Sequence, residues 1–171
     1  MAVYKTNFND MPQDNLLPAG EYEVYVASCY TNATKGGTEY LDLQLQVRDD
    51  IDQPCKNRKI FESLWLSAKA FEITQRSMNL ISKLCGVPDD KEYQTLNEWG
   101  ADITGKMMRV RVYHQKGNDG YPDKARINKW SESTAPEPMG PITGRDEAMK
   151  AVAVLKTGGG FQTVADSDLP F

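Results

Sequence analysis

The spacing of apolar residues changes partway along this chain of 171 residues, and that change restricts the fold more than any other feature. Apolar and polar residues alternate strictly between Glu39 and Arg48, a period of two that predicts a half-buried strand. Apolar, β-branched and aromatic residues at 21–31 and 58–66 predict strands on either side of it. The first part of the chain is therefore expected to form three consecutive strands.

A helix is expected after these strands, because the apolar period lengthens there. Ser67 is the expected N-cap and Gly86 the expected residue after the helix C-terminus, whereas residues 87–102 are expected to be irregular. The apolar stripe that predicts the helix consists of Phe71, Met78, Ile81, Leu84 and Cys85.

Two further strands complete the pattern. Residues 108–113 alternate again, Gly117–Gly120 has the composition of a hairpin turn, and residues 124–130 predict the returning strand. Three strands, a helix and two strands form the order of the OB-fold, which binds oligonucleotides on one face. We therefore predict a mainly β chain: a five-stranded OB-fold barrel with one helix between strands three and four.

The composition divides the chain into three regions. Residues 1–19 are a polar lead-in, 20–131 are the expected OB-fold domain, and 132–171 are a linker rich in Pro and Ser followed by an acidic, flexible tail. Within that tail, residues 145–156 have helix-forming composition. No apolar run is long enough to cross a bilayer and no signal peptide is visible, so we expect a cytoplasmic protein without a membrane partner.

Basic and aromatic residues alternate with core residues on the expected strands. Although the net charge is -4, residues 103–130 are locally basic. Phosphates require cations and unpaired bases require flat rings, so this combination favours binding to a single strand. The alternative is that the cations only solvate the sheet and Trp130 lies in the core. The predicted DNA-binding residues are Tyr40, Arg48, Lys56, Arg58, Lys59, Arg109, Arg111, Tyr113, Lys124, Arg126, Lys129 and Trp130.

The chain ends on an acidic tip in which Pro170 restricts the backbone before a terminal aromatic residue. This tip closely resembles the acidic tail of bacterial single-stranded DNA-binding proteins, which recruits replication and repair enzymes. The resemblance implies that the tip binds a protein partner, in which a pocket holds the terminal carboxylate. The predicted partner-binding residues are Asp166, Asp168, Leu169, Pro170 and Phe171.

The body of the chain resembles phage-encoded single-stranded DNA-binding proteins. The residues that carry this resemblance are Pro18–Tyr22, Leu41–Leu45 and Gly105-Lys106. It implies a protein that coats single-stranded DNA without sequence specificity during phage DNA replication or recombination, and that recruits replication and recombination proteins through its tip. The alternative is a protein-interaction adaptor on an OB scaffold. Self-association would suit the coating function, because one OB barrel covers only ~4–16 nucleotides.

The sequence supports a catalytic function less well than a binding function. No Ser or Cys lies in a recognisable nucleophile motif, and the three cysteines have no metal-ligand spacing. We therefore expect no enzyme, no metal and no cofactor. The acids Asp49, Asp50 and Asp52 leave a nuclease open as a third reading, although this loop lacks the pattern of a calcium-binding loop.

Overall fold

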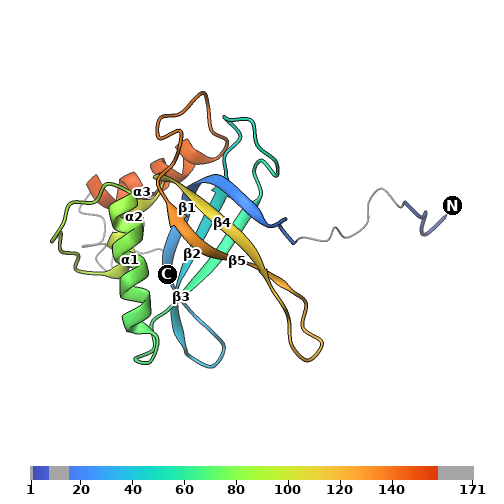
Figure 1. Ribbon diagram of the computed structural model, residues 1–171, viewed down its shortest axis with the longest axis horizontal. Helices are drawn as coiled ribbons and strands as arrows, with labels where there is room; N and C mark the ends of the chain where they lie inside the picture. Colours follow the sequence, from blue (N-terminus) through green and yellow to red (C-terminus); the bar gives the residue numbers. More distant parts are fainter. Residues whose placement is uncertain (1, 8–15, 158–171) are drawn as a thin grey trace.

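The computed structural model describes residues 2–7 and 16–157, and it consists of one antiparallel sheet with three helices (Figure 1). The sheet order is β3-β2-β1-β4-β5, so strands that are far apart in sequence become neighbours through β1. The strands are β1 (Gly20–Ala33), β2 (Glu39–Val47), β3 (Lys59–Trp65), β4 (Met107–Gln115) and β5 (Lys124–Ser131). All five predicted strands are thereby confirmed.

The expected closed barrel is not found. The two edge strands, β3 and β5, form no hydrogen-bonded ladder with each other in the described part of the chain. They approach through side chains instead: Arg126 Nη2 lies 3.0 Å from Glu62 Oε1. The sheet therefore has an open seam between β3 and β5, which leaves room for a groove.

The helical prediction was partly wrong. The helix α1 (Phe71–Leu84) begins three residues later than expected, and Ala70 rather than Ser67 is its N-cap. Gly86 follows the C-cap residue Cys85 with φ 77°, a left-handed conformation that glycine adopts without steric cost. The expected helix over 145–156 is confirmed as α3 (Arg145–Thr157).

A second helix, α2 (Leu96–Ile103), lies in the region expected to be irregular. Its N-terminus is a capping box, in which Glu98 N donates to Thr95 Oγ1 and Thr95 N donates to Glu98. The Thr-x-x-Glu spacing was the available sequence signal. In the described ranges, no helix has both the length and the apolar composition needed to cross a membrane.

Helix α2 covers the part of β1 that has no strand neighbour on the β4 side. Thr31 N donates to Asn97 Oδ1 at 2.8 Å, which satisfies a backbone donor at the sheet edge. A Cβ at Gly100 would lie 2.0 Å from the carbonyl oxygen of Cys29, so only glycine permits this approach. The helix therefore covers the edge of β1, and its close approach requires a glycine at position 100.

The core lies on the inner face of the sheet, as the alternation predicted. Leu41, Leu43, Leu45 and Val47 of β2 are fully buried. The inner residues of β4 are buried as well, with Met108, Val110 and Val112 at 2% exposure or less. The cysteines are free thiols, and burial raises the pKa values of Cys29 and Cys85 to about 12.

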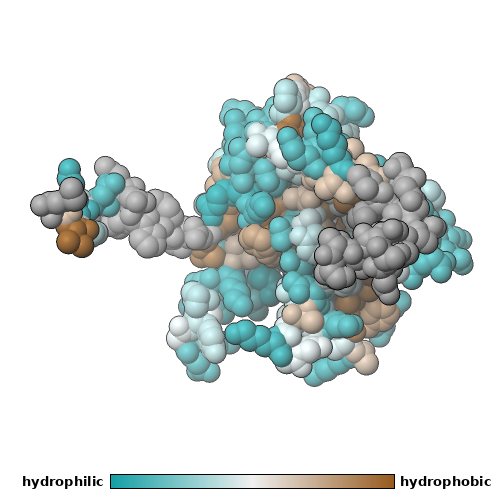
Figure 2. Space-filling model, turned by 180° about the vertical axis from the view of Figure 1, so that it is seen from behind, coloured by the Kyte–Doolittle hydropathy of each residue, from teal (hydrophilic) through white to brown (hydrophobic). Residues whose placement is uncertain are grey.

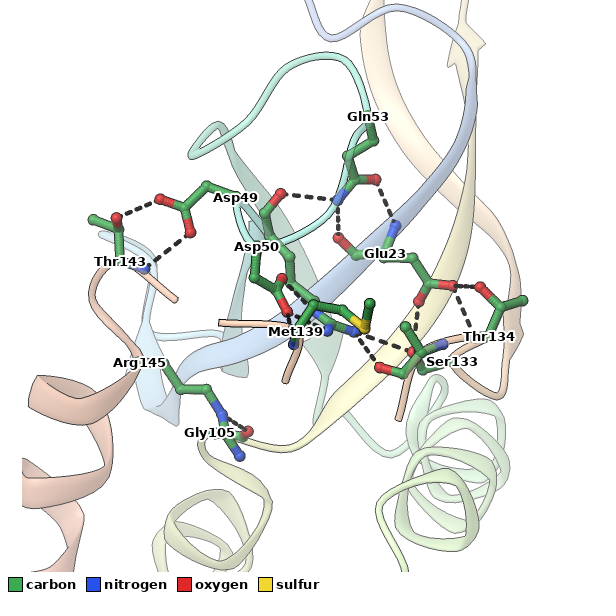
Figure 3. A network of polar contacts seen from close by, with 12 residues as sticks. Glu23, Asp49, Asp50, Gln53, Gly105, Ser133, Thr134, Met139, Thr143 and Arg145 are labelled. Atoms are coloured by element: carbon green, nitrogen blue, oxygen red, sulfur yellow. Dashed lines mark hydrogen bonds and ion pairs between the residues drawn. The ribbon is translucent and has the colours of Figure 1, made fainter. Parts of the chain in front are cut away.

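The expected linker is not free over residues 133–145, which we call the strap. Figure 3 shows polar side chains of the sheet meeting this segment. Glu23 accepts hydrogen bonds from Ser133 Oγ at 2.8 Å and from Thr134 N at 2.9 Å. Tyr25 Oη donates to Thr143 O at 2.9 Å. The folded unit thus continues past residue 131 and positions α3 against α2 and β1.

Arg48 and the two acids that follow it hold the strap. Arg48 and Asp50 form an ion pair at 2.6 Å, and both side chains are fully buried. Arg48 Nη1 also donates to Ala135 O at 2.7 Å. Burial raises the pKa of Asp50, but hydrogen bonds from Arg48 and from Met139 N outweigh burial and leave it lowered. Hydrogen bonds from the side chain and backbone of Thr143 lower the pKa of Asp49. Two acids of the proposed nuclease loop therefore bind the strap.

Candidate functional site

A groove of about 710 Å³ follows the open seam between β3 and the end of the β4–β5 hairpin. Figure 2 shows apolar residues gathered beside the point where the lead-in joins the body, with polar residues above and below them. Leu17 of the lead-in and Pro122 of the hairpin loop contribute to the wall. The charged and aromatic residues that line the groove are Arg58, Lys59, Phe61, Trp65, Asp123, Lys124 and Arg126.

The pleat of β3 explains how the rings reach the groove. Successive side chains of a strand point to opposite faces, so Ile60 and Leu64 enter the core while Phe61 and Trp65 remain outside. Phe61 is 60% exposed and Trp65 is 39% exposed. Sequence reasoning assigned this strand from its apolar residues but did not include these two rings among the predicted DNA-binding residues. The alternation that assigns Ile60 and Leu64 to the core also places Phe61 and Trp65 on the outer face, and this was the available sequence signal.

Tyr40, a predicted stacking residue, extends the aromatic surface from β3 onto β2. It is the cross-strand neighbour of Trp65. The two ring centroids are 5.2 Å apart and the ring planes are tilted by 46°, a favourable arrangement for an aromatic pair. Tyr40 therefore supports Trp65 from the side of β2.

Four predicted cations are brought together by the groove: Arg58 and Lys59 at the start of β3, and Lys124 and Arg126 on β5. Arg126 lines the groove and also forms an ion pair with Glu62 across the seam. Burial raises the pKa of Glu62, and the Arg126 guanidinium opposes that effect. The second carboxylate oxygen of Glu62, Oε2, is buried without a hydrogen-bond partner among the described residues.

Other predicted cations lie outside the groove. Arg109 and Arg111 stand on the outer face of β4, and both bind the carboxylate of Glu21 on β1. Hydrogen bonds from Arg109, and then from Arg111, lower the pKa of Glu21. Lys129 lies opposite Arg111 on β5, and Tyr113, 38% exposed, lies opposite Arg126. This face is therefore more nearly neutral than the sequence suggested.

Three predicted contacts are placed elsewhere. Arg48 was expected on the polar face of its strand, but β2 ends at Val47 and the arginine turns inward to Asp50. Trp130 lies opposite Val110 and packs on the core, which was the stated alternative, because the β4–β5 register shifts between Arg111 and Val112. Lys56 is exposed in the turn before β3 and does not line the groove.

The predicted partner-binding tip, Asp166–Phe171, lies outside the described residues. In the described ranges, no group of three or more His, Cys, Asp or Glu side chains is arranged as a metal site would require.

Residues 4–138 match the model of a protein family described as "Protein of unknown function (DUF669)". This chain belongs to that family. The match spans the sheet, α1, α2 and the first residues of the strap, so the groove between β3 and β5 lies inside the family region. No curated protein matches the chain.

Proposed function

We propose that this protein binds and coats single-stranded DNA through the groove between β3 and β5. In this proposal the binding is not sequence-specific and the protein is not an enzyme. The observation that carries the proposal is the meeting of four cations with two exposed rings along one seam. Cations attract the phosphates, while Phe61 and Trp65 provide surfaces on which bases stack.

The strand order supports an OB-fold reading of the sheet. OB-folds are partly open five-stranded barrels that bind ligands on strands two and three and on the loops between strands one and two and between strands four and five. Here the groove uses β3 and the β4–β5 loop, and Figure 1 shows the β1–β2 and β4–β5 hairpins projecting from the same end of the sheet. We place the protein in phage DNA replication or recombination on the basis of its resemblance to phage-encoded proteins.

Binding to oligo-dT should weaken with salt. With four phosphate contacts, the slope of log K against log salt should be about -3 for a single strand. Replacing Lys59 and Lys124 with alanine should reduce that slope by about 1.4 in magnitude, because each contact contributes about 0.7. The measurement is a fluorescence titration over a range of salt concentrations, since Trp65 is exposed beside the groove.

The control for this experiment removes the same charge elsewhere. Lys69 and Lys150 are exposed and do not line the groove, so the variant Lys69→Ala/Lys150→Ala should keep the parental slope. Equal slopes for both double variants would show that phosphates are not bound along the seam. An absence of binding at low salt would refute the proposed function.

The C-terminal tip is proposed to recruit a replication or recombination protein. Deletion of residues 166–171 should leave oligo-dT affinity unchanged or slightly higher, because the deletion removes two acidic side chains and no groove residue. The same deletion should abolish partner capture in a pull-down with the full chain as reference. A scrambled tip of identical composition is the control, and capture by the scrambled tip would contradict a specific terminal motif.

A further inference from the structure

Asp42 lies at the centre of an aromatic surface that continues the groove onto β2. Its cross-strand neighbours are Tyr30 on β1 and Ser63 on β3. Directly opposite residues in a sheet have Cβ atoms about 4.5–5.5 Å apart, so these side chains adjoin the carboxylate. Tyr40 stands two residues away on the same face of β2, beside Trp65. An acid is thus placed among rings rather than among cations.

The carboxylate of Asp42 is oriented but not neutralised. Gln44 Nε2 donates to Asp42 Oδ2 at 3.5 Å, from the next outward position of the strand. Within the described ranges, Asp42 has no ion pair with Lys or Arg. Its side chain is half-buried, so one oxygen remains for a ligand.

A free carboxylate on this surface disfavours phosphates, because like charges repel. It favours hydrogen-bond donors, and in a single strand the donors are on the base edges. Ser63 lies between Phe61 and Trp65 on β3, and Asp42 lies opposite Ser63. In the proposed complex, a base stacked on either ring would therefore bring its edge near Asp42 on β2. The phosphates of the same strand would remain on the side of Lys59, Lys124 and Arg126.

We propose that Asp42, beside the groove, is a specificity-determining residue, and that it selects bases with an exocyclic amino group over thymine. This inference rests on the proposed single-strand binding. Cytosine presents its N4 amino group as a donor, for which Asp and Glu are the matching acceptors. Thymine presents one N–H between two carbonyl oxygens, and these oxygens repel a carboxylate. The protein therefore binds many sequences, with a graded preference for cytosine over thymine.

The test compares oligo-dC with oligo-dT of equal length at slightly alkaline pH, where cytosine is unprotonated. The parental protein should bind oligo-dC about tenfold more tightly, the scale of a hydrogen bond to a charged acceptor. Asp42→Asn should reduce that ratio about fivefold or more, because the neutral amide is a weaker acceptor and can donate to thymine carbonyls.

Glu39→Gln is the matched control, since Glu39 begins β2 and is exposed, and its substitution removes the same charge. It should change the affinity for both oligonucleotides by the same factor and leave their ratio unchanged. Equal binding of the two oligonucleotides by the parental protein, or an unchanged ratio in Asp42→Asn, would overturn the role of Asp42 while salt-dependent binding still upheld the groove. Failure to bind either oligonucleotide would overturn the proposed function and this inference with it.

Discussion

Replacing Arg48 with alanine should lower the free energy of unfolding by about 3–5 kcal/mol, because Asp50 would be left as a buried charge without its partner. Both side chains are fully buried, and Arg48 also donates hydrogen bonds to Ser133 and Ala135 of the strap. The substitution removes these contacts together. Urea denaturation measures the loss, and amide hydrogen exchange should show faster exchange in residues 133–145.

Arg76→Ala is the control, because Arg76 pairs with Glu72 on the exposed face of α1 and both side chains are 76% exposed. Such surface pairs contribute little, so its unfolding midpoint should stay close to that of the parental protein. The double variant Arg48→Met/Asp50→Asn should recover part of the loss, since no uncompensated charge remains. A loss below about 1 kcal/mol for Arg48→Ala would show that the pair does not hold the strap.

Truncating the two rings of the groove should weaken single-stranded DNA binding more than removing any one cation. Trp65→Ala and Phe61→Ala should each cost about 1–3 kcal/mol, the range measured for stacking of a base on an aromatic side chain. The two rings lie four residues apart on β3, about 13 Å at the rise of a strand, so they would stack different bases. Fluorescence anisotropy with a labelled oligonucleotide measures each affinity independently of protein tryptophan.

Two further variants separate stacking from other effects. Trp65→Phe should retain most of the affinity but lose most of the tryptophan quenching, because Trp99 is buried and Trp130 packs on the core. Tyr4→Ala removes a ring that is 78% exposed in the lead-in and should leave the affinity unchanged. If Phe61→Ala and Trp65→Ala both bind as tightly as the parental protein, bases do not stack along β3.

Much of the sheet follows from local sequence. Strict alternation in β2 and β4 requires one face to be buried, and the glycines at residues 37 and 120 adopt the positive φ that their turns need. The short helix α2 was missed because eight residues provide little more than two turns of periodicity, and its identity depends on the capping box and on packing against β1. Element type was thus predictable where the repeat was long.

The candidate site was only partly predictable. The sequence placed Lys124 and Arg126 on the polar side of one strand and Arg58 and Lys59 at the entry to another, and the groove brings these four together. The same reasoning placed Arg109 and Arg111 in the site, but the pairing of β1 with β4 puts Glu21 beside both. No local sequence pattern predicts this pairing, because Glu21 and Arg111 are 90 positions apart.

The sequence by itself determined the strands, their order along the chain and, in β1, β2 and β4, the side that enters the core, because these depend on residues two to four positions apart. Only the tertiary structure decided that β3 and β5 meet without a ladder, that Phe61 and Trp65 face the cations across that seam, and that Arg48 is buried beneath the strap. The physical reason is that each of these outcomes rests on contacts between distant segments, such as Arg48 with Ser133 across 85 positions, and such contacts form only once the whole sheet is assembled.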